Sequence, residues 1–134
     1  MVLMSDDSDV QARRLRLKRL LEELREVKGM GTELVTVIIP PDRQVSDVRQ
    51  QLGNEAGQAR NIKSNTTRKH VIDAIESASA ALSPRKDAGK FGIALFTGHV
   101  IVGNNKTRMK TYVFDDPPEP FTSFRYRCDS RFEI

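Results

Sequence analysis

The chain has 134 residues, of which 38% are hydrophobic and 30% charged, as is ordinary for one globular domain that can bury a core. No apolar run approaches the roughly 20 residues of a membrane span, and the N-terminus turns acidic too early for a secretory signal, so we expect a soluble cytoplasmic protein. A net charge of +4 suits a polyanionic partner without naming one. A single cysteine, Cys128, excludes an internal disulfide and a cysteine-based zinc cluster.

The N-terminal part of the chain predicts one helix and one strand. Residues 1–9 are polar and acidic, and we expect them to be disordered. From Val10 to Lys28, leucines recur at three- and four-residue steps until a glycine-rich break, which predicts a helix. Its other face is cationic, and is either simply solvated or a contact for phosphates. Residues 34–39 are mostly β-branched and end at a proline pair, which predicts a buried strand.

Two amphipathic segments after this strand predict a helical hairpin. The first has apolar residues at helical spacing between positions 45 and 59, and Ser46 or Asp47 can cap its start. The second runs from about Thr66 to Leu82, and Pro84 closes it because the residue before proline disfavours helix. The short polar break between the two helices is therefore the tip of the hairpin.

The rest of the chain predicts strands joined by polar turns. One strand precedes the helical pair and several follow it, which indicates an α+β domain. We expect a mostly antiparallel sheet of about four to five strands, covered by helices, with the hairpin protruding from a single domain over residues 10–134. The expected strands are 91–96, 100–102, 109–114 and 122–128, with turns at Thr97-Gly98-His99 and Gly103-Asn104-Asn105.

Cations gather at the predicted hairpin tip. Lys63 offers a flexible charge with three donors, Asn61 can donate and accept, and Ser64 adds a hydroxyl. This combination suits RNA phosphates, riboses and base edges, while the alternative is a capped helix start with solvated charges. Residues 60–70 hold four cations and no acid, a local charge of +4: Arg60, Lys63, Arg68 and Lys69.

Three separated motifs occur in one order along the chain. They are Gly31-Thr32-Glu33 before the strand that ends at Pro40-Pro41, Glu55 six residues before Asn61-Ile62-Lys63-Ser64, and the segment from Tyr126 to Phe132, which reads Tyr-x-Cys-x-x-x-Phe. Together they resemble the N-terminal domain of the class I peptide chain release factors of archaea and eukaryotes, with the archaeal branch the better match. Glu33 departs from the family's serine, so we expect it to face solvent or to pair with an arginine.

The resemblance implies a decoding role in translation termination. The family's hairpin enters the decoding centre of the small ribosomal subunit and recognises UAA, UAG and UGA in messenger RNA. The stop-codon-binding residues implied by the match are Thr32, Glu55, Asn61, Ile62, Lys63, Ser64, Tyr126 and Cys128, and the further candidates for contact with the RNA backbone are Arg60, Arg68 and Lys69.

The chemistry of these residues fits those implied roles. Lys63, aided by Asn61 and Ser64, would secure the first-position uridine, because a donor aimed at the uracil O4 acceptor discriminates against the amino group of cytosine. Glu55 can accept from purine amino groups, and Tyr126 can support the purines or orient that carboxylate.

The resemblance also implies what the chain lacks. The family's Gly-Gly-Gln signature for peptidyl-tRNA hydrolysis is absent, since Ala56 precedes Gly57-Gln58. We therefore expect a monomeric, non-enzymatic N-terminal fragment of a longer factor, without cofactor, metal or membrane contact, whose missing C-terminal domain would engage a translational GTPase. His70 and His99 offer no metal-ligand spacing. The alternative function is a general RNA- or rRNA-binding domain without codon specificity.

Overall fold

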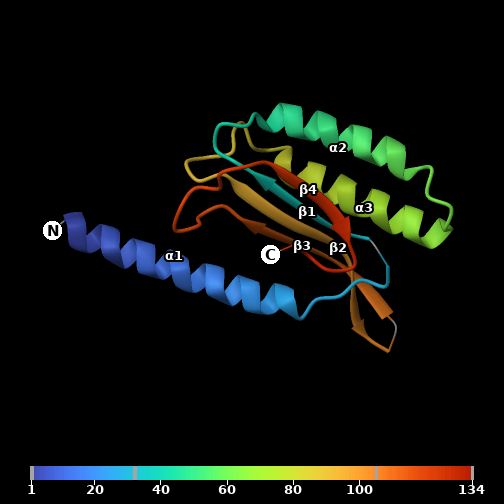
Figure 1. Cartoon of the computed structure of the whole chain (residues 1–134), viewed down its shortest axis with the longest axis horizontal. Coiled ribbons are helices and arrows are strands. Elements are labelled where there is room, and N and C mark those ends of the chain that lie inside the picture. Colours follow the sequence, from blue (N-terminus) through green and yellow to red (C-terminus); the bar gives the residue numbers. More distant parts are fainter. Residues whose placement is uncertain (1, 32, 105, 134) are drawn as a thin grey trace.

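A computed structural model describes residues 2–31, 33–104 and 106–133, with side chains from residue 8 onward. In these described residues, three helices and four strands follow one another (Figure 1). Their bounds are α1 Val2–Arg25, β1 Leu34–Ile39, α2 Val45–Ala59, α3 Asn65–Leu82, β2 Ile93–Gly103, β3 Lys106–Phe114 and β4 Arg125–Asp129.

The four strands form one antiparallel sheet in the order β3-β2-β1-β4, which confirms the predicted α+β class. The α2–α3 hairpin covers one face of the sheet and α1 lies on the other (Figure 1). Because β1 is central and covered on both sides, its apolar residues serve two cores. Val35, Val37 and Ile39 pack with the hairpin, whereas Leu34 packs with Leu24 of α1.

The hairpin starts and ends close to the predicted positions. α3 ends at Leu82, as expected, and begins at Asn65 with Ser64 as its N-cap. The expected capping of the first helix by Ser46 or Asp47 is wrong, since α2 begins at Val45 and the preceding Gln44 makes no side-chain cap. Val45 is buried in the core, and this packing draws the first turn of the helix one residue earlier.

Helix α1 begins at Val2 instead of Val10, so the expectation of disorder over residues 1–9 differs from the structure, in which 2–9 are helical. This segment contains no glycine or proline to break a helix. An ion pair between Asp9 and Arg13, 3.0 Å long and one turn apart, ties the added part to the rest of α1. The helix ends at Arg25, short of the expected Lys28.

The expected turn at Thr97-Gly98-His99 is wrong, because β2 runs through it without interruption. At Gly98, a Cβ atom would lie 2.8 Å from the Glu33 carbonyl oxygen, and the backbone has φ +152°. Glycine here permits a close approach of two strands instead of a turn. The turn after β2 is confirmed at Gly103 and Asn104, where Asn104 has φ 46°; Asn105 lies outside the described residues.

The expected last strand begins three residues too early. β4 covers Arg125–Asp129 instead of 122–128, because it pairs only with residues 34–38 of β1. No helix among the described residues is both long and apolar enough to cross a membrane.

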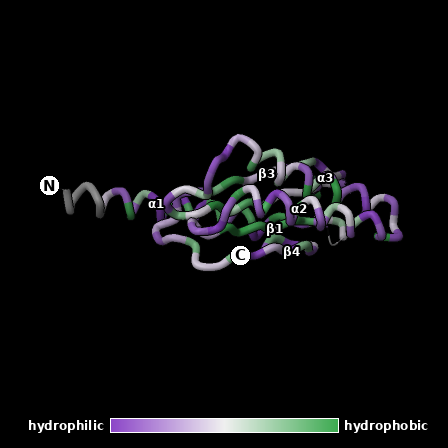
Figure 2. The backbone as a smooth tube through the Cα atoms, turned by 90° about the horizontal axis from the view of Figure 1, so that it is seen from above, coloured by the Kyte–Doolittle hydropathy of each residue, from purple (hydrophilic) through white to green (hydrophobic). Residues whose placement is uncertain are grey.

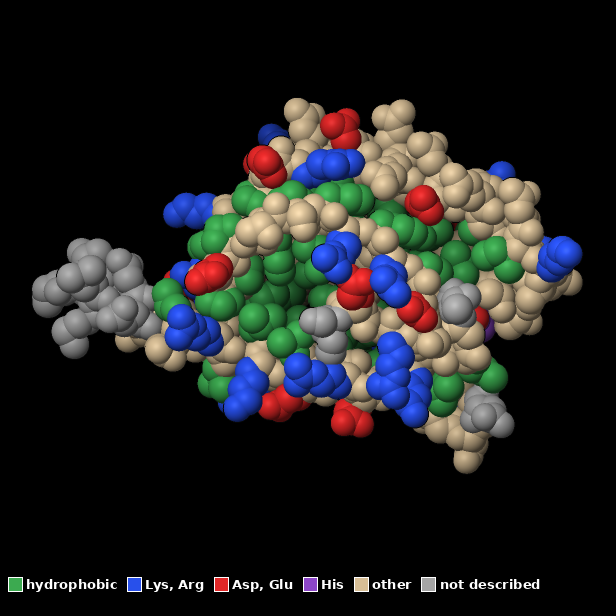
Figure 3. Space-filling model, in the orientation of Figure 1, with side chains coloured by type: hydrophobic (Ala, Val, Ile, Leu, Met, Phe, Trp, Pro, Cys, Tyr) green, Lys and Arg blue, Asp and Glu red, His purple; other side chains and the backbone are tan. Residues whose placement is uncertain are grey.

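The face covered by α1 is packed more loosely than the face covered by the hairpin. Among the α1 residues whose side chains are described, 8–25, only Leu24 is fully buried. A hollow of about 450 Å³ lies between this helix and the sheet, where Figure 3 shows a recess of hydrophobic side chains. Figure 2 shows the hydrophobic chain concentrated in the strands at the middle of the molecule and hydrophilic residues at the far end of the hairpin. That far end is the predicted tip.

Candidate nucleic-acid interface

The tip of the hairpin, residues 60–64, holds polar side chains in solvent on a firmly anchored backbone. Asn61 and Lys63 are exposed, whereas Ile62 between them is half-buried and packs against the hairpin core. The Asn61 amide donates to the Gln58 carbonyl at 3.1 Å, and the Ile62 amide donates to the Ala59 carbonyl at 3.0 Å. The alternation of exposed and buried positions therefore directs Asn61 and Lys63 outward.

Ser64 and Arg68 hold the other side of the tip. The Ser64 hydroxyl oxygen accepts a hydrogen bond from the Thr67 amide at 3.3 Å, which caps α3. Arg68 is half-buried, and its guanidinium donates to the Ile62 carbonyl at 3.0 Å and to the Asn65 side chain. Of the three cations expected to contact the RNA backbone, Arg60 and Lys69 are exposed, whereas Arg68 is engaged within the tip.

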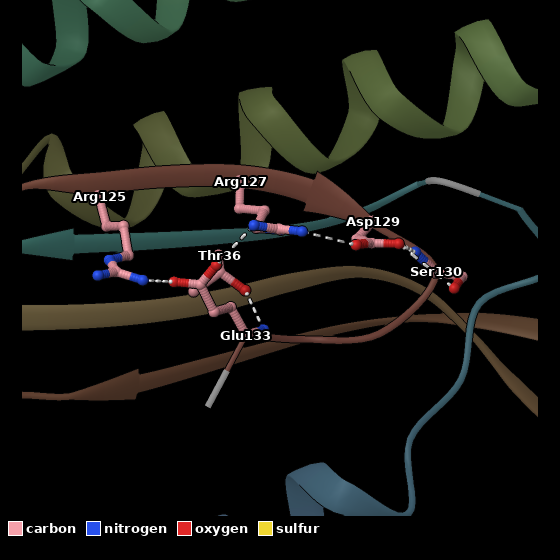
Figure 4. A network of polar contacts seen from close by, with 6 residues as sticks. All are labelled: Thr36, Arg125, Arg127, Asp129, Ser130 and Glu133. Carbon is pink, nitrogen blue, oxygen red and sulfur yellow. Dashed lines mark hydrogen bonds and ion pairs between the residues drawn. The ribbon is translucent and has the colours of Figure 1, made fainter.

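Strand β4 supplies a second set of candidate residues. Successive side chains of a strand point to opposite faces, so Tyr126 and Cys128 face the hairpin while Arg125 and Arg127 face away. Figure 4 shows both arginines converging on Glu133, with the Arg127 guanidinium 3.3 Å from its carboxylate.

The chain after β4 is anchored to the sheet by further contacts in the same network. The Glu133 amide donates to the Thr36 hydroxyl at 3.0 Å (Figure 4). The Asp129 carboxylate accepts from the Ser130 amide at 2.7 Å, and this hydrogen bond is the main reason why its pKa is lowered. These contacts fix β4 from the side opposite the hairpin, which leaves Tyr126 and Cys128 in a defined position on the hairpin face.

A shallow hollow of about 300 Å³ lies where β4 meets the hairpin. Glu55, Ile62, Tyr126 and Cys128, which come from three separate stretches of sequence, all contribute to it. Asn61, Lys63 and Ser64 do not line it and lie at the adjoining tip; Thr32 lies outside the described residues. The full lining is Glu55, Gln58, Ala59, Ile62, Val71, Tyr126 and Cys128.

The hollow favours the protonated forms of Tyr126 and Cys128. Burial, helped by the nearby Cys128 and Glu55, raises the pKa of the Tyr126 hydroxyl well above its ordinary value. Burial also raises the pKa of the Cys128 thiol to about 11, with Asp129, Glu33 and Glu55 adding negative charge around it. At neutral pH the wall therefore presents a phenol O–H and a thiol S–H beside the Glu55 side chain.

Two features of this region were missed by the sequence patterns. Gln58 lines the hollow, and its position one helical turn after Glu55 is a signal that could have identified it. Glu33, expected to face solvent or to pair with an arginine, does neither: its side chain is only 2% exposed and lies beside His70. Among the described residues, no group of three His, Cys, Asp or Glu side chains could hold a metal ion.

Comparison with known proteins places this geometry in one family. The profile of the family described as eRF1 domain 1 matches residues 12–134. The chain is 46% identical over 134 residues to peptide chain release factor subunit 1 of Thermoplasma acidophilum, covering 100% of this chain and 31% of that protein. It is 47% identical over 129 residues to the protein of the same name from Methanococcoides burtonii, covering 96% of this chain and 30% of the relative.

Solved structures agree with the sequence relatives. A crystal structure described as the archaeal translation termination factor aRF1 superposes with a TM-score of 0.79 at 34% identity, covering 90% of this chain and 32% of that one. A second, described only as an archaeal protein, has a TM-score of 0.83 at 34% identity, covering 90% of this chain and 33% of that one. The chain thus spans about a third of the length of its relatives, and it belongs to the eRF1 domain 1 family, the N-terminal domain of archaeal peptide chain release factor subunit 1.

Proposed function

We propose that this chain is the stop-codon-reading domain of an archaeal release factor and acts in translation termination. The observation that carries the proposal is the meeting of Glu55, Tyr126 and Cys128 around one hollow beside the cationic tip. These residues belong to α2 and β4, and the tip belongs to the loop before α3, so three parts of the chain surround the site.

The donors and acceptors of this site suit the three stop codons. Lys63 and Asn61 are exposed at the tip and can donate hydrogen bonds. The O4 atom of uracil can accept such a hydrogen bond, whereas the amino group of cytosine cannot. The Glu55 carboxylate can accept from the amino groups of adenine and guanine, and the protonated Tyr126 hydroxyl can donate to a base edge. The Tyr126 ring, which lines the hollow, offers a surface for base stacking.

In this proposal the chain reads the stop codon, and domains outside this chain promote hydrolysis of the peptidyl-tRNA. The chain has no Gly-Gly-Gln sequence, and its relatives are about three times as long. We therefore expect the 134-residue chain alone to release no peptide from ribosomes programmed with a stop codon. A measurable rate of release by the chain alone would overturn this division.

The decisive experiment grafts the chain onto the remaining domains of a release factor from one of its archaeal relatives. Peptide release is then measured on ribosomes programmed with UAA, UAG, UGA or the sense codon UGG. If the chain reads stop codons, we expect peptide release on UAA, UAG and UGA and little release on UGG. Equal release on all four codons would overturn the proposed function.

A pair of lysine variants separates codon reading from general RNA binding. Lys63→Ala should reduce the stop-codon response of the graft far more than its binding to ribosomes. Lys86→Ala removes a lysine that is also exposed but lies far from the tip in sequence, and it is the matched control. If Lys63→Ala weakened binding to all RNA alike, a general RNA-binding domain would be the better assignment.

A further inference from the structure

A buried carboxylate lies immediately before β1. The Glu33 side chain is 2% exposed, although glutamate is almost never fully buried without a partner. Its Oε1 atom lies 3.1 Å from Nδ1 of His70 on α3. Among the described residues, neither of these two buried atoms has a hydrogen-bond partner of good geometry, and their 3.1 Å contact with each other is within ion-pair distance.

The contact continues through a second histidine. The His70 ring stacks on the His99 ring of β2, with ring centroids 3.9 Å apart and planes 18° from parallel. Nε2 of His99 then lies 3.1 Å from the Asp73 carboxylate, which returns the chain of contacts to α3. We call Glu33, His70, Asp73 and His99 the histidine cluster; it connects the start of β1, helix α3 and strand β2.

The histidine cluster adjoins the reading hollow through β1. Glu33 directly precedes Leu34, and the next residue, Val35, pairs with Cys128 in the β1–β4 register. Glu33 also acts electrostatically on the hollow, because it is one cause of the raised pKa of the Cys128 thiol. A shift of Glu33 relative to α3 would therefore move the β4 wall of the hollow relative to the hairpin.

The segment before β1 also lies against the start of α3. A Cβ atom at Gly31 would be 3.9 Å from the Thr67 hydroxyl, in the first turn of that helix. The Gly29 amide donates to the Ser130 carbonyl at 2.9 Å, which ties the same segment to the end of β4. The segment thus contacts both the helix that begins at the tip and the strand that carries the wall.

We propose that the histidine cluster positions the two sides of the codon-reading hollow. Glu33 and His70 would touch no base; they hold the start of β1 at a fixed distance from α3, so that Tyr126 and Cys128 face Glu55 and the tip in one arrangement. This inference rests on the proposed stop-codon-reading function, but its structural part can be tested without the ribosome.

Two substitutions at His70 separate its two contacts. His70→Phe keeps a ring that can stack on His99 but offers no donor to Glu33. His70→Asn keeps a donor nitrogen at the same number of bonds from the backbone as Nδ1 but loses the stacked ring. Both leave the Glu33 side chain itself unaltered. Glu76→Gln, which alters an exposed carboxylate on α3, is the control.

The first measurement is the alkylation rate of Cys128 in the isolated chain, at one pH below its pKa and under conditions where each variant is folded. Cys128 lines the hollow, so its rate reports the separation of the wall from the hairpin. We expect His70→Phe to raise the rate on the order of tenfold, because a wall that is held less firmly opens more often and exposes the thiol. His70→Asn should recover most of the difference. A rate in His70→Phe equal to that in Glu76→Gln would overturn the proposal.

The second measurement uses the graft described above. His70→Phe should lower maximal release on the stop codons on the order of tenfold while the concentration for half-maximal release changes little. The ratio of stop-codon to UGG release should fall with it. A merely structural role would reduce the amount of active protein and leave that ratio unchanged, which would overturn the proposal.

The two measurements keep the two hypotheses apart. If the unsubstituted graft failed to distinguish stop codons from UGG, the proposed function would fail. The Cys128 alkylation rates would still decide whether the histidine cluster holds the hollow. If the graft read stop codons and the His70→Phe variant read them equally well, the proposed function would stand and the inference about the cluster would fail.

Discussion

The hairpin tip and His70 of the histidine cluster belong to one short stretch of the chain, residues 60–70, but the two regions hold their polar groups in opposite ways. At the tip, Asn61 and Lys63 are exposed, and the ordered contacts of Ser64 and Arg68 are with residues three to six positions away. In the cluster, His70 meets Glu33 and His99, which come from distant parts of the chain, and Glu33 is buried.

Because of this difference, substitutions at the tip should mainly change binding, whereas substitutions in the cluster should mainly change stability. Exposed side chains stay hydrated in the folded state, so their replacement changes what the surface can bind and leaves the free energy of unfolding nearly unchanged. A buried carboxylate without its partner is destabilising, because nothing replaces the lost hydration. Substitutions should therefore affect stability most in the cluster and least at the tip.

The largest loss of stability is expected for His70→Phe. Glu33 would remain buried without the imidazole beside it, which should lower the free energy of unfolding by about 3 kcal/mol. Urea unfolding followed by circular dichroism measures the loss. The double variant Glu33→Leu/His70→Phe removes both polar groups and should recover most of it. A loss of less than about 1 kcal/mol in the single variant would show that Glu33 does not depend on His70.

The next largest loss is expected for Gly98→Ala, at the close approach of β2 to Glu33. The added Cβ would lie 2.8 Å from the Glu33 carbonyl oxygen in a conformation that alanine rarely adopts. We expect a loss of about 2 kcal/mol in the same unfolding measurement. Gly53→Ala is the matched control, since nothing lies within 4 Å of its Cβ position in α2, and alanine there should stabilise the chain. Equal effects at the two sites would contradict the close approach.

A smaller loss is expected for Ser64→Ala at the tip. It removes the side-chain acceptor of the Thr67 amide, so the free energy of unfolding should fall by about 1 kcal/mol. Ser64→Asp supplies another acceptor at the helix start and should restore the stability. If both variants unfolded like the unsubstituted chain, Ser64 would not act as the cap.

The smallest effect on stability is expected for Lys63→Ala. Its side chain is exposed, so the midpoint of urea unfolding should change by the equivalent of less than about 0.5 kcal/mol. The same variant should cause a large loss of stop-codon response in the graft. A stability loss as large as that of Ser64→Ala would mean that Lys63 supports the tip, and the contrast between the two regions would then be weaker.

Local patterns were sufficient for most of the elements that carry the candidate site. The β-branched run before Pro40-Pro41 identified β1 with its observed bounds, because the chemistry of strand and breaker is contained in adjacent residues. The polar break between two helical periodicities likewise located the tip. The Tyr-x-Cys spacing put two side chains on one face of β4, since alternation along a strand is a local property.

The sequence by itself therefore determined the hairpin, its cationic tip, the central strand and the motifs of the family. Only the tertiary structure decided that Gly98 continues a strand, that Glu33 is buried beside His70, and that His70 stacks on His99. The physical reason is that helix, strand and cap depend on residues a few positions apart, whereas burial and pairing depend on which distant segments the sheet brings together. Glycine is compatible with a turn or with a close approach, and a charged residue with solvent or with a buried partner, so their roles depend on the neighbours that the fold supplies.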